Sequence, residues 1–323
     1  MQSNIKQVVA IVGPTASGKT SLSVSVALHF NGEIISADSM QIYKGMDIAT
    51  AKPSDKEKRG ITHHLMDYVL PDENYSVARF ISDACKACED IMSRGKLPII
   101  AGGTGLYVDS FLNGISFSDG DTDFSLRDKL MSRCETEGID SLLDELKGID
   151  PASAERLSTE KNKKRIVRAL EIYYTTGRTQ TEQNLLSKLK PSEYAPVYIG
   201  LNFRDRERLY ERINRRVDLM VEAGLIKEAK EYFGSNLSST SVQAIGYKEL
   251  KPYFDGEKTL GECLELLKQA TRRYAKRQLT WFRRNNEINW FFVDDYNNFE
   301  ELSEDVFLFL KSKGFEINEN QMV

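Results

Sequence analysis

The sequence predicts an α/β protein with a doubly wound parallel sheet and an inserted all-helical lobe. Three observations support this class. Short apolar runs alternate with helical patterns, as they do when helices cover both faces of a parallel sheet. Polar motifs follow the first three runs directly, at the place where open α/β sheets bind ligands. A helical stretch that is too long for one crossover connection separates the third run from the fourth.

The apolar runs have the length and composition of buried strands. They are Val8–Val12, Glu33–Ala37, Leu97–Ala101, Val197–Asn202 and Asn289–Val293. Helical patterns lie between most of them, and outside the insertion the clearest are Ser21–Phe30, Ser76–Arg94, Asp205–Glu222 and Leu225–Phe233. This alternation predicts parallel strands that are joined by crossover helices.

The loop after the first strand fits the phosphate-binding pattern G-x-x-x-x-G-K-[ST] at every fixed position. It reads Gly13-Pro14-Thr15-Ala16-Ser17-Gly18-Lys19-Thr20. In such a P-loop the glycines let backbone N–H groups turn toward phosphate oxygens, and the following helix adds its positive N-terminal end. Lys19 would supply charge to the terminal phosphates, and the Thr20 hydroxyl would bind Mg²⁺. The sheet is therefore predicted to be a P-loop sheet that holds a polyphosphate.

Two further polar residues are expected at the same edge of the sheet. Asp38 follows the second strand and is our candidate for the general base. Like charge on a bound polyphosphate disfavours its ionised form, while Lys19 and Mg²⁺ favour it, so Asp38 can accept a proton. Mg²⁺ ligation or a helix cap is the alternative role. Thr104 follows Gly102-Gly103, which allows close backbone approach, although a turn made for packing would look the same.

The gap between the third and fourth strands contains helical segments and no convincing strand. These segments are Ser125–Glu137, Ile139–Leu146 and Lys161–Thr176. We interpret them as a lobe inserted into the core, with polar hinges at Ser116–Asp123 and Lys190–Pro196. The predicted division is a first part of the catalytic core at 1–117, the insertion at 118–195 and a second part of the core at 196–323. The terminal segment Phe315–Val323 is expected to fray.

Basic residues gather locally although the net charge is −4. Arg212 and Arg216 share one face of a helix and suit a diphosphate, but pairing with neighbouring carboxylates is equally common. The segment Thr271–Arg284 mixes aromatic and basic residues, a pattern that grips unpaired bases and phosphates. Its aromatic residues are Tyr274, Trp281 and Phe282, and they could instead anchor the helix to the core.

A second basic cluster lies on the insertion. It comprises Lys161, Lys163, Lys164, Arg165 and Arg168. Two such clusters, one on each lobe, could flank a duplex stem of RNA.

Composition excludes several classes of protein. With 323 residues, 41% of them hydrophobic and 28% charged, the chain is neither disordered nor collagen-like. It shows no apolar run near the roughly 20 residues that span a bilayer and no signal-peptide pattern, so we expect a cytoplasmic protein without a membrane partner. Its 4 cysteines suit a reducing compartment. Cys85-x-x-Cys88 has no second pair and no nearby histidine, so a zinc or redox site is not predicted.

Taken together, the motifs resemble those of the tRNA dimethylallyltransferase family, also called tRNA isopentenyltransferases, in its bacterial form. The matching segments run in order from residue 13 to about 283. After the P-loop they are Asp38-Ser39-Met40-Gln41-Ile42-Tyr43, Thr50-Ala51-Lys52-Pro53, Gly102-Gly103-Thr104-Gly105-Leu106-Tyr107, Arg165-Ile166-Val167-Arg168-Ala169-Leu170-Glu171, Arg212-Ile213 with Arg216, Gln243-Ala244-Ile245-Gly246-Tyr247-Lys248 and Thr271-Arg272-Arg273-Tyr274-Ala275-Lys276-Arg277-Gln278. These 323 residues show no counterpart of the zinc-finger extension of some eukaryotic members, so we expect a compact enzyme of the bacterial type.

The resemblance implies transfer of a dimethylallyl group from dimethylallyl diphosphate to N6 of the adenosine 3′-adjacent to the anticodon in tRNA, with release of diphosphate. It implies that Asp38 takes the N6 proton and that Thr104 bonds near the reacting centre. A base is needed because the lone pair of an adenine amino group is delocalised into the ring.

The resemblance also implies two sets of binding residues in a monomeric enzyme. Diphosphate, with Mg²⁺, would be held by Gly13, Pro14, Thr15, Ala16, Ser17, Gly18, Lys19, Thr20, Arg212 and Arg216. The anticodon stem-loop of tRNA would be held by Asp38, Ser39, Met40, Gln41, Thr104, Arg127, Arg165, Arg168, Gln243, Gly246, Lys248, Arg272, Arg273, Arg277 and Gln278.

Three other functions are compatible with some of the motifs. A P-loop kinase of nucleotides or small metabolites would use the same loop and Asp38, but it would not need a basic aromatic helix. An isopentenyltransferase acting on free adenine nucleotides would keep the site without two RNA-binding clusters. An RNA-binding module could hold a nucleotide only as a structural ligand.

Overall fold

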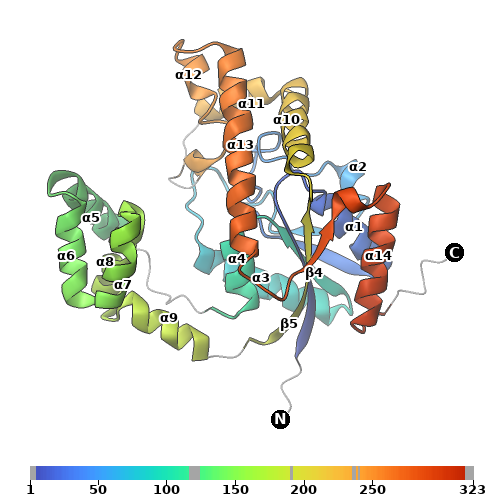
Figure 1. Cartoon of the computed structure of the whole chain (residues 1–323), viewed down its shortest axis with the longest axis horizontal. Helices are drawn as coiled ribbons and strands as arrows, with labels where there is room; N and C mark the ends of the chain where they lie inside the picture. The colour runs from blue at the N-terminus through green and yellow to red at the C-terminus, as the bar shows by residue number, and fades with distance from the viewer. Residues whose placement is uncertain (1–4, 116–123, 190–191, 235–237, 239–240, 317–323) are drawn as a thin grey trace. The chain divides into compact units, whose positions relative to one another are not determined.

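The computed structural model describes residues 5–115, 124–189, 192–234, 238 and 241–316 of the chain. The chain divides into two compact units, one of residues 1–112 and 193–323 and one of residues 113–192. Figure 1 follows the chain through both units, and the second unit covers most of the expected insertion at 118–195. Among the helices that the structure describes, none combines the length and apolar character needed to cross a membrane.

The first unit is built on a parallel sheet with the strand order β3-β2-β4-β1-β5-β6. The strands are β1 (Lys6–Val12), β2 (Gly32–Ser36), β3 (His63–His64), β4 (Leu97–Gly102), β5 (Tyr194–Asn202) and β6 (Asn289–Phe292). All five predicted strands are confirmed, and only the two-residue β3 was too short to predict. Val12 pairs with Gly102 of β4 and Gly200 of β5, so the carboxyl ends of the central strands meet at one edge.

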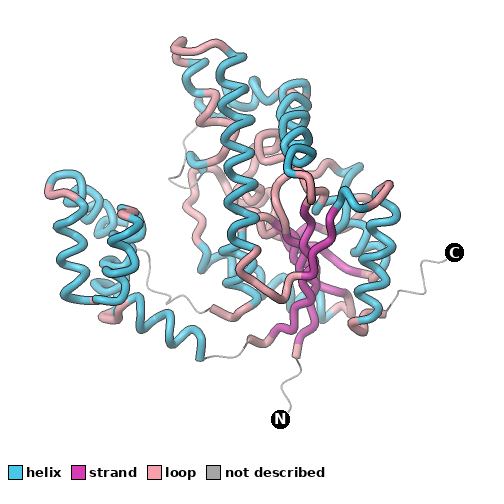
Figure 2. Tube along the Cα trace, in the orientation of Figure 1, coloured by secondary structure: helices cyan, strands magenta, loops and turns pink. Residues whose placement is uncertain are grey.

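Helices cover both faces of this sheet, as Figures 1 and 2 show. Alternate residues of β1 point to opposite faces. Val9 and Ile11 belong to the core formed with α1 (Lys19–His29) and α14 (Phe299–Ser312). Val8 and Ala10 belong to the larger core on the other face. That core includes residues of α3 (Val77–Ser93), α4 (Gly105–Leu112), α11 (Leu225–Phe233) and α13 (Leu260–Phe282). The uninterrupted apolar run of β1 follows from burial on both faces.

The other helical elements of the first unit lie in its connections. They are α2 (Asp55–Lys58), α10 (Arg206–Glu222), η1 (Ser241–Gln243), α12 (Lys251–Phe254) and η2 (Val293–Asp295). Helix α13 begins 11 residues before the predicted basic segment, because Thr259 and Glu262 form a capping box at its start. The same helix therefore contains an apolar half and a basic half.

The second unit is all-helical, with its own hydrophobic core. Its helices are α5 (Phe124–Thr136), α6 (Ile139–Ile149), α7 (Pro151–Glu160), α8 (Lys163–Thr176) and α9 (Gln180–Leu189). Leu142, Leu146, Ile166 and Leu170 are fully buried in this core. Helix α7 was not predicted, although Asp150 caps it and Pro151 is its first residue.

Two expectations about the ends of segments need correction. The predicted hinge at Lys190–Pro196 is partly wrong, because Tyr194–Pro196 pairs with Lys6–Val8 at the start of β5. The frayed end predicted from Phe315 is wrong at that residue, because Phe315 is 7% exposed and lies in a core with Phe30. The other predicted hinge, 116–123, and the segment 317–323 lie outside the described residues.

Candidate active site

The P-loop between β1 and α1 has backbone angles that its glycines permit. Gly13 has a φ of 145°, and a Cβ there would lie 2.4 Å from the carbonyl oxygen of Leu201 in β5. Gly18 has a φ of 97° and precedes α1 without a side-chain cap. The first turn of α1 therefore keeps its N–H groups available for an anion.

Three cationic side chains bond to this loop. Lys19 Nζ donates to the carbonyl of Pro14 at 2.6 Å. From α10, Arg216 Nη1 donates to Thr15 Oγ1 at 3.2 Å and Arg212 Nε donates to the carbonyl of Ala16 at 2.9 Å. Neither arginine forms an ion pair with a described carboxylate. The two arginines predicted at the diphosphate thus lie beside the P-loop.

Burial, together with the nearby Arg216 guanidinium and against the opposing effect of Asp38, lowers the pKa of Lys19 to about 7. Burial also lowers the pKa of Arg216, whose charge is favoured by Asp38. Excess positive charge is therefore concentrated in a partly desolvated place, which favours binding of a polyanion.

Asp38 and Thr104 are brought together where β2 and β4 end. A Cβ on Gly102 would lie 2.2 Å from the carbonyl oxygen of Ala37, so glycine allows these two strand ends to approach. Thr104 Oγ1 accepts a hydrogen bond from Ser39 N at 3.1 Å. Asp38 Oδ1 accepts one from Met40 N at 3.0 Å. The predicted proximity of these motifs at the sheet edge is thus present in the structure.

Two cavities and a groove meet at this edge. The inner cavity, about 80 Å³, is lined by Lys19 and Thr20 among others. The apolar cavity, about 250 Å³, is lined by side chains such as Met40, Val217 and Leu267. The outer groove, about 1010 Å³, extends from the P-loop along α10. Residues that line both cavities are Thr15, Asp38, Thr50, Arg216 and Tyr274.

Tyr274 of α13, which the sequence predicted either to stack on bases or to anchor the helix, lies in the candidate active site itself. Its ring is half-buried and lines both cavities. Burial and the charge of Asp38 raise its pKa, so the hydroxyl keeps its proton at neutral pH. A signal was present, because Tyr274 and Gln278 are four residues apart and therefore share one face of the helix.

Other residues of α13 pack into the first unit instead of facing an RNA. Phe282 is 2% exposed, and Trp281 Nε1 donates to Asp109 Oδ2 at 2.6 Å. Gln278 is 5% exposed; its Nε2 donates to the carbonyl of Gly103 at 3.0 Å and its Oε1 accepts from Thr15 N at 2.8 Å. The anchoring alternative therefore applies to the two aromatic residues. Gln278, predicted to contact RNA, links the P-loop to the turn after β4.

The predicted basic residues of α13 differ in their surroundings. Arg273 and Arg277 are exposed, and the Arg277 guanidinium lies 5.6 Å from the centre of the Tyr274 ring. Arg272 is held by Asn214 Oδ1 at 2.6 Å. Lys248 and Gly246 line the apolar cavity, as does Arg277. Gln243 belongs to η1.

In the second unit, all three predicted arginines form ion pairs. Arg127 and Arg168 each approach the buried Glu171 within 2.9 Å, and Arg165 pairs with Glu160. Lys163 and Lys164 are exposed. Exposed positive charge of this unit therefore remains at the start of α8, where Lys163 and Lys164 lie.

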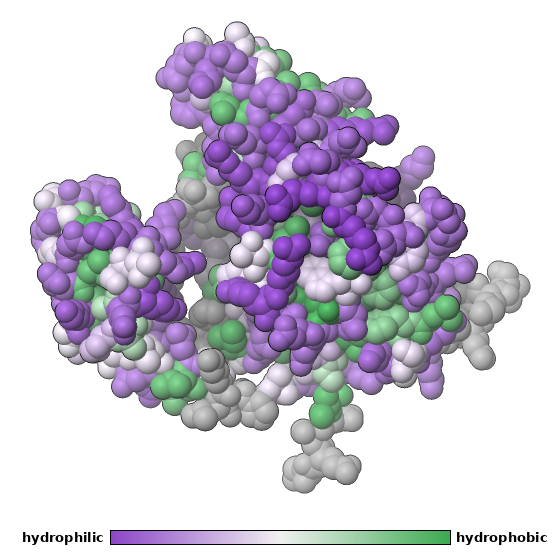
Figure 3. Space-filling view, viewed as in Figure 1, coloured by the Kyte–Doolittle hydropathy of each residue, from purple (hydrophilic) through white to green (hydrophobic). Residues whose placement is uncertain are grey.

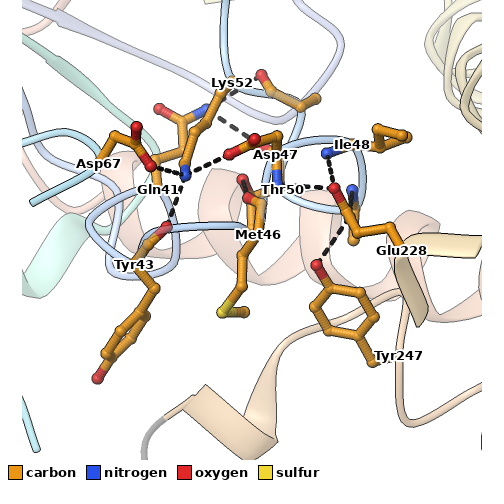
Figure 4. Close-up of polar contacts among 12 residues, drawn as sticks. Gln41, Tyr43, Met46, Asp47, Ile48, Thr50, Lys52, Asp67, Glu228 and Tyr247 are labelled. Atoms are coloured by element: carbon orange, nitrogen blue, oxygen red, sulfur yellow. Dashed lines mark hydrogen bonds and ion pairs between the residues drawn. The ribbon is translucent and has the colours of Figure 1, made fainter. Parts of the chain in front are cut away.

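Gln41 and Lys52 form hydrogen bonds that hold together the segments around residues 41–52 at the wall of the site. Gln41 Nε2 donates to the carbonyls of Thr50 and Ala51, and its Oε1 accepts from Ser36 Oγ at 3.3 Å. Lys52 Nζ donates to Asp47 Oδ1 and Asp67 Oδ1, both at 2.6 Å. Figure 4 shows the contacts of Lys52 with Asp47 and Asp67. The motif Thr50-Ala51-Lys52-Pro53 thus folds back on the segment after Asp38.

The oxygen atoms of the inner cavity suit Mg²⁺ better than a transition metal. Thr20, Ser36 and Asp38 line this cavity together. Among the residues that the structure describes, no three His, Cys, Asp or Glu side chains form a metal-binding group. Mg²⁺ commonly takes few protein ligands and completes its shell with water and phosphate oxygens, so the donor set agrees with Mg²⁺.

Comparisons with known proteins agree with this geometry. A family model described as IPP transferase matches residues 41–285. The tRNA dimethylallyltransferase of Thermoanaerobacter sp. (strain X514) is 49% identical over 311 residues, which cover 95% of this chain and 98% of that protein. That of Bacillus subtilis (strain 168) is 46% identical, covering 96% of this chain and 98% of its own length.

Solved structures are also similar. The full-length tRNA isopentenylpyrophosphate transferase of Bacillus halodurans has a TM-score of 0.71 and 44% identity, covering 96% of this chain and 97% of that one. A eukaryotic dimethylallyltransferase acting on tRNA has a TM-score of 0.81 and 31% identity, covering 97% of this chain and 81% of that one.

Proposed function

The chain belongs to the IPP transferase family, and we propose that it transfers a dimethylallyl group from dimethylallyl diphosphate to N6 of the adenosine 3′-adjacent to the anticodon in tRNA. The observation that carries the proposal is the position of Asp38. Its carboxylate lines both the inner cavity with the P-loop and the apolar cavity beside it. A base at this junction can accept a proton from a nucleophile on one side, while the leaving diphosphate lies on the other side.

Asp38 is the proposed general base. As N6 forms its bond to C1 of the dimethylallyl group, the C1–O bond breaks and diphosphate leaves. The N6 proton passes to the Asp38 carboxylate, whose Oδ1 is oriented by Met40 N. Thr104 Oγ1 accepts a hydrogen bond from the Ser39 amide, next to Asp38 in the chain. We expect this hydroxyl to form a hydrogen bond with the adenine or with the Asp38 carboxylate.

The P-loop and its cations are the proposed diphosphate site. Backbone N–H groups at the start of α1 and the charges of Lys19, Arg212 and Arg216 stabilise the negative charge that develops on the departing group. One preorganised donor of this kind contributes about 2.7–4 kcal/mol to the transition state. Mg²⁺, held through Thr20, would neutralise further charge on the diphosphate.

The apolar cavity is the proposed place for the adenine and the five-carbon chain. Side chains such as Met40, Val217 and Leu267 exclude water from it. The adenine must leave its stack to enter, which costs a few kcal/mol, and less when the base already lies in a loop. Tyr274 and Arg277 at the cavity wall are positioned to recover part of that cost.

The experiment measures transfer of radiolabelled dimethylallyl groups from dimethylallyl diphosphate to an anticodon stem-loop RNA. The wild type is expected to label the RNA, and Asp38→Asn to lower kcat by about 10²- to 10⁴-fold while its affinity for dimethylallyl diphosphate changes little. Asp72→Asn, which changes an exposed carboxylate, is the matched control.

Three results would contradict the proposal. Full activity of Asp38→Asn would remove the base assignment. Phosphoryl transfer from ATP without labelling of RNA would favour a kinase. Equal turnover of free AMP and RNA would favour an enzyme of free nucleotides.

A further inference from the structure

Glu228, an acidic residue outside the predicted site, holds in place a loop that forms part of the site. The 46–50 loop (Met46–Thr50) ends in a turn at 48–50, and three of its backbone amides converge on Glu228 of α11. Glu228 Oε2 accepts from Asp47 N at 2.9 Å and from Ile48 N at 2.7 Å, while Oε1 accepts from Ala49 N at 2.9 Å. Figure 4 shows the carboxylate pointing at the loop. Successive amides of this kind form an anion-binding nest.

Two features keep Glu228 in this position. It lies in the first turn of α11, where the helix dipole favours a negative charge. Tyr247 OH donates to Glu228 Oε1 at 2.7 Å. Tyr247 is fully buried, and its ring stacks on Tyr232 of α11, with the ring centres 3.9 Å apart.

The segment that carries Tyr247 also touches the loop directly. Gly246 has a φ of 114°, and a Cβ there would lie 2.9 Å from Cβ of Ala49. The motif Gln243-Ala244-Ile245-Gly246-Tyr247-Lys248, which we predicted to bind RNA, therefore also has a packing function against the loop.

The loop positions residues of the active site. Thr50 lines both the inner and the apolar cavity, and Ala49 lines the apolar one. Asp47 and Ile48 line the outer groove. A displacement of the loop would change the shape of all three spaces, and a misplacement of about 1 Å can cost about 100-fold in rate.

We propose that Glu228 is a positioning residue for the reaction, whose negative charge holds the 46–50 loop in the shape that binds dimethylallyl diphosphate and the adenine. The inference rests on the proposed function. The charge is essential because both carboxylate oxygens accept two hydrogen bonds each. In Glu228→Gln, an NH₂ group would replace one oxygen and face donors instead of offering an acceptor.

The test is chemical rescue. Glu228→Ala is expected to lower kcat/KM for dimethylallyl diphosphate about 10- to 100-fold. Formate, which can occupy the nest as an anion, is expected to restore at least a fifth of the lost activity, whereas formamide should restore none. Glu231→Ala, on the exposed side of the same helix, is the matched control and should resemble the wild type with and without formate.

A second set of measurements separates positioning from folding. Hydrogen exchange of the 46–50 loop should accelerate in Glu228→Ala and slow again with formate, while exchange in β1 and β4 stays unchanged. If Glu228→Ala does not fold, Tyr247→Phe removes one donor and leaves the ring stack; it should lower kcat/KM severalfold in the same direction.

The outcomes are distinguishable. Activity of Glu228→Ala within twofold of wild type, or equal rescue by formate and formamide, would overturn the inference while leaving the proposed function intact. An inactive wild type would contradict the proposed function, and the exchange data would then decide the role of Glu228 alone.

Discussion

Lys19 combines two properties at the scale of a single residue. It is the fixed lysine of the P-loop, and in the structure its ammonium donates to the carbonyl of Pro14. Burial and Arg216 lower its pKa to about 7, so near neutral pH the side chain is only partly charged without an anion. A bound diphosphate would favour the charged form and raise the pKa again.

We therefore predict that kcat/KM for dimethylallyl diphosphate depends on Lys19 at alkaline pH. The Lys19 amine must be protonated to hold the diphosphate. The affinity for dimethylallyl diphosphate should therefore be full well below pH 7 and fall as the pH rises through about 7. The limiting slope above that value is about tenfold per pH unit. Initial rates between pH 6 and 9 at subsaturating dimethylallyl diphosphate measure the effect.

Lys19→Arg is the control for this prediction, because a guanidinium stays charged over the whole range. Its activity is expected to be lower at pH 6 but flat on the alkaline side. The same alkaline decline in Lys19→Arg would assign the titration to another group.

At the scale of secondary-structure elements, the Glu33 carboxylate links neighbouring strands through hydrogen bonds to basic side chains. Glu33 lies in β2 and is 3% exposed. Its carboxylate accepts from Arg94 Nη2 at 2.7 Å and Lys96 Nζ at 2.8 Å, both near the start of β4, and it bonds His64 Nε2 of β3 at 2.7 Å. The sequence shows this glutamate only as the first residue of an apolar run.

We predict that Glu33 contributes to stability above the ordinary carboxyl pKa. The Arg94 guanidinium lowers the pKa of Glu33 against the opposing effect of burial, and Lys96 and His64 lower it further. Its contribution should be complete above the ordinary value of 4.5 and be lost as the pH falls below it. Urea unfolding at pH 7, 5 and 3.5 measures this dependence.

Glu33→Gln should lower the free energy of unfolding at pH 7 by about 1–3 kcal/mol and weaken its pH dependence. We expect the lower part of this range because the Arg94 and Lys96 side chains are 39% and 36% exposed. Glu304→Gln, an exposed change on α14, should leave both quantities unaltered. Equal effects of the two variants would exclude a specific role for Glu33.

At the scale of the whole molecule, each unit carries its own exposed basic cluster. In the first unit it includes Arg273 and Arg277 of α13, and in the second it includes Lys163 and Lys164 of α8. Figure 3 shows hydrophilic surface over much of α13 and α10 in the first unit. A net charge of −4 hides these clusters, because they are local.

If both clusters contact the phosphates of one RNA, each double alanine variant should weaken tRNA binding and reduce its salt dependence. The slope of log K against log salt should fall by about 0.9 for each lost contact to a duplex phosphate. The measurement is fluorescence anisotropy with labelled tRNA between about 50 and 200 mM salt, a range over which affinity that depends on phosphate contacts falls steeply.

The exposed lysines Lys258 and Lys147, one in each unit, are the matched controls for alanine substitution. An unchanged slope in Lys163→Ala/Lys164→Ala would remove the second unit from the RNA interface. An unchanged slope in Arg273→Ala/Arg277→Ala would do the same for α13.

The sequence by itself determined every strand except β3, the P-loop and the place of Asp38, because these depend on local pattern. An apolar run buried on both faces and a glycine loop before a helix are visible without any knowledge of the fold. Parallel pairing then brings the ends of such strands to one edge, which is why the proximity of Asp38 and Thr104 could be predicted.

Only the tertiary structure decided which polar side chains bind within the protein and which stay free. Gln278 and Arg127 are of residue types that often bind RNA, but in the structure they bond to partners that are distant in the sequence, Thr15 and Glu171. Glu228 has no motif around it, yet it holds the 46–50 loop, which is some 180 residues away in the chain. Hydrogen bonds depend on distance in space, and single-sequence patterns record only distance along the chain.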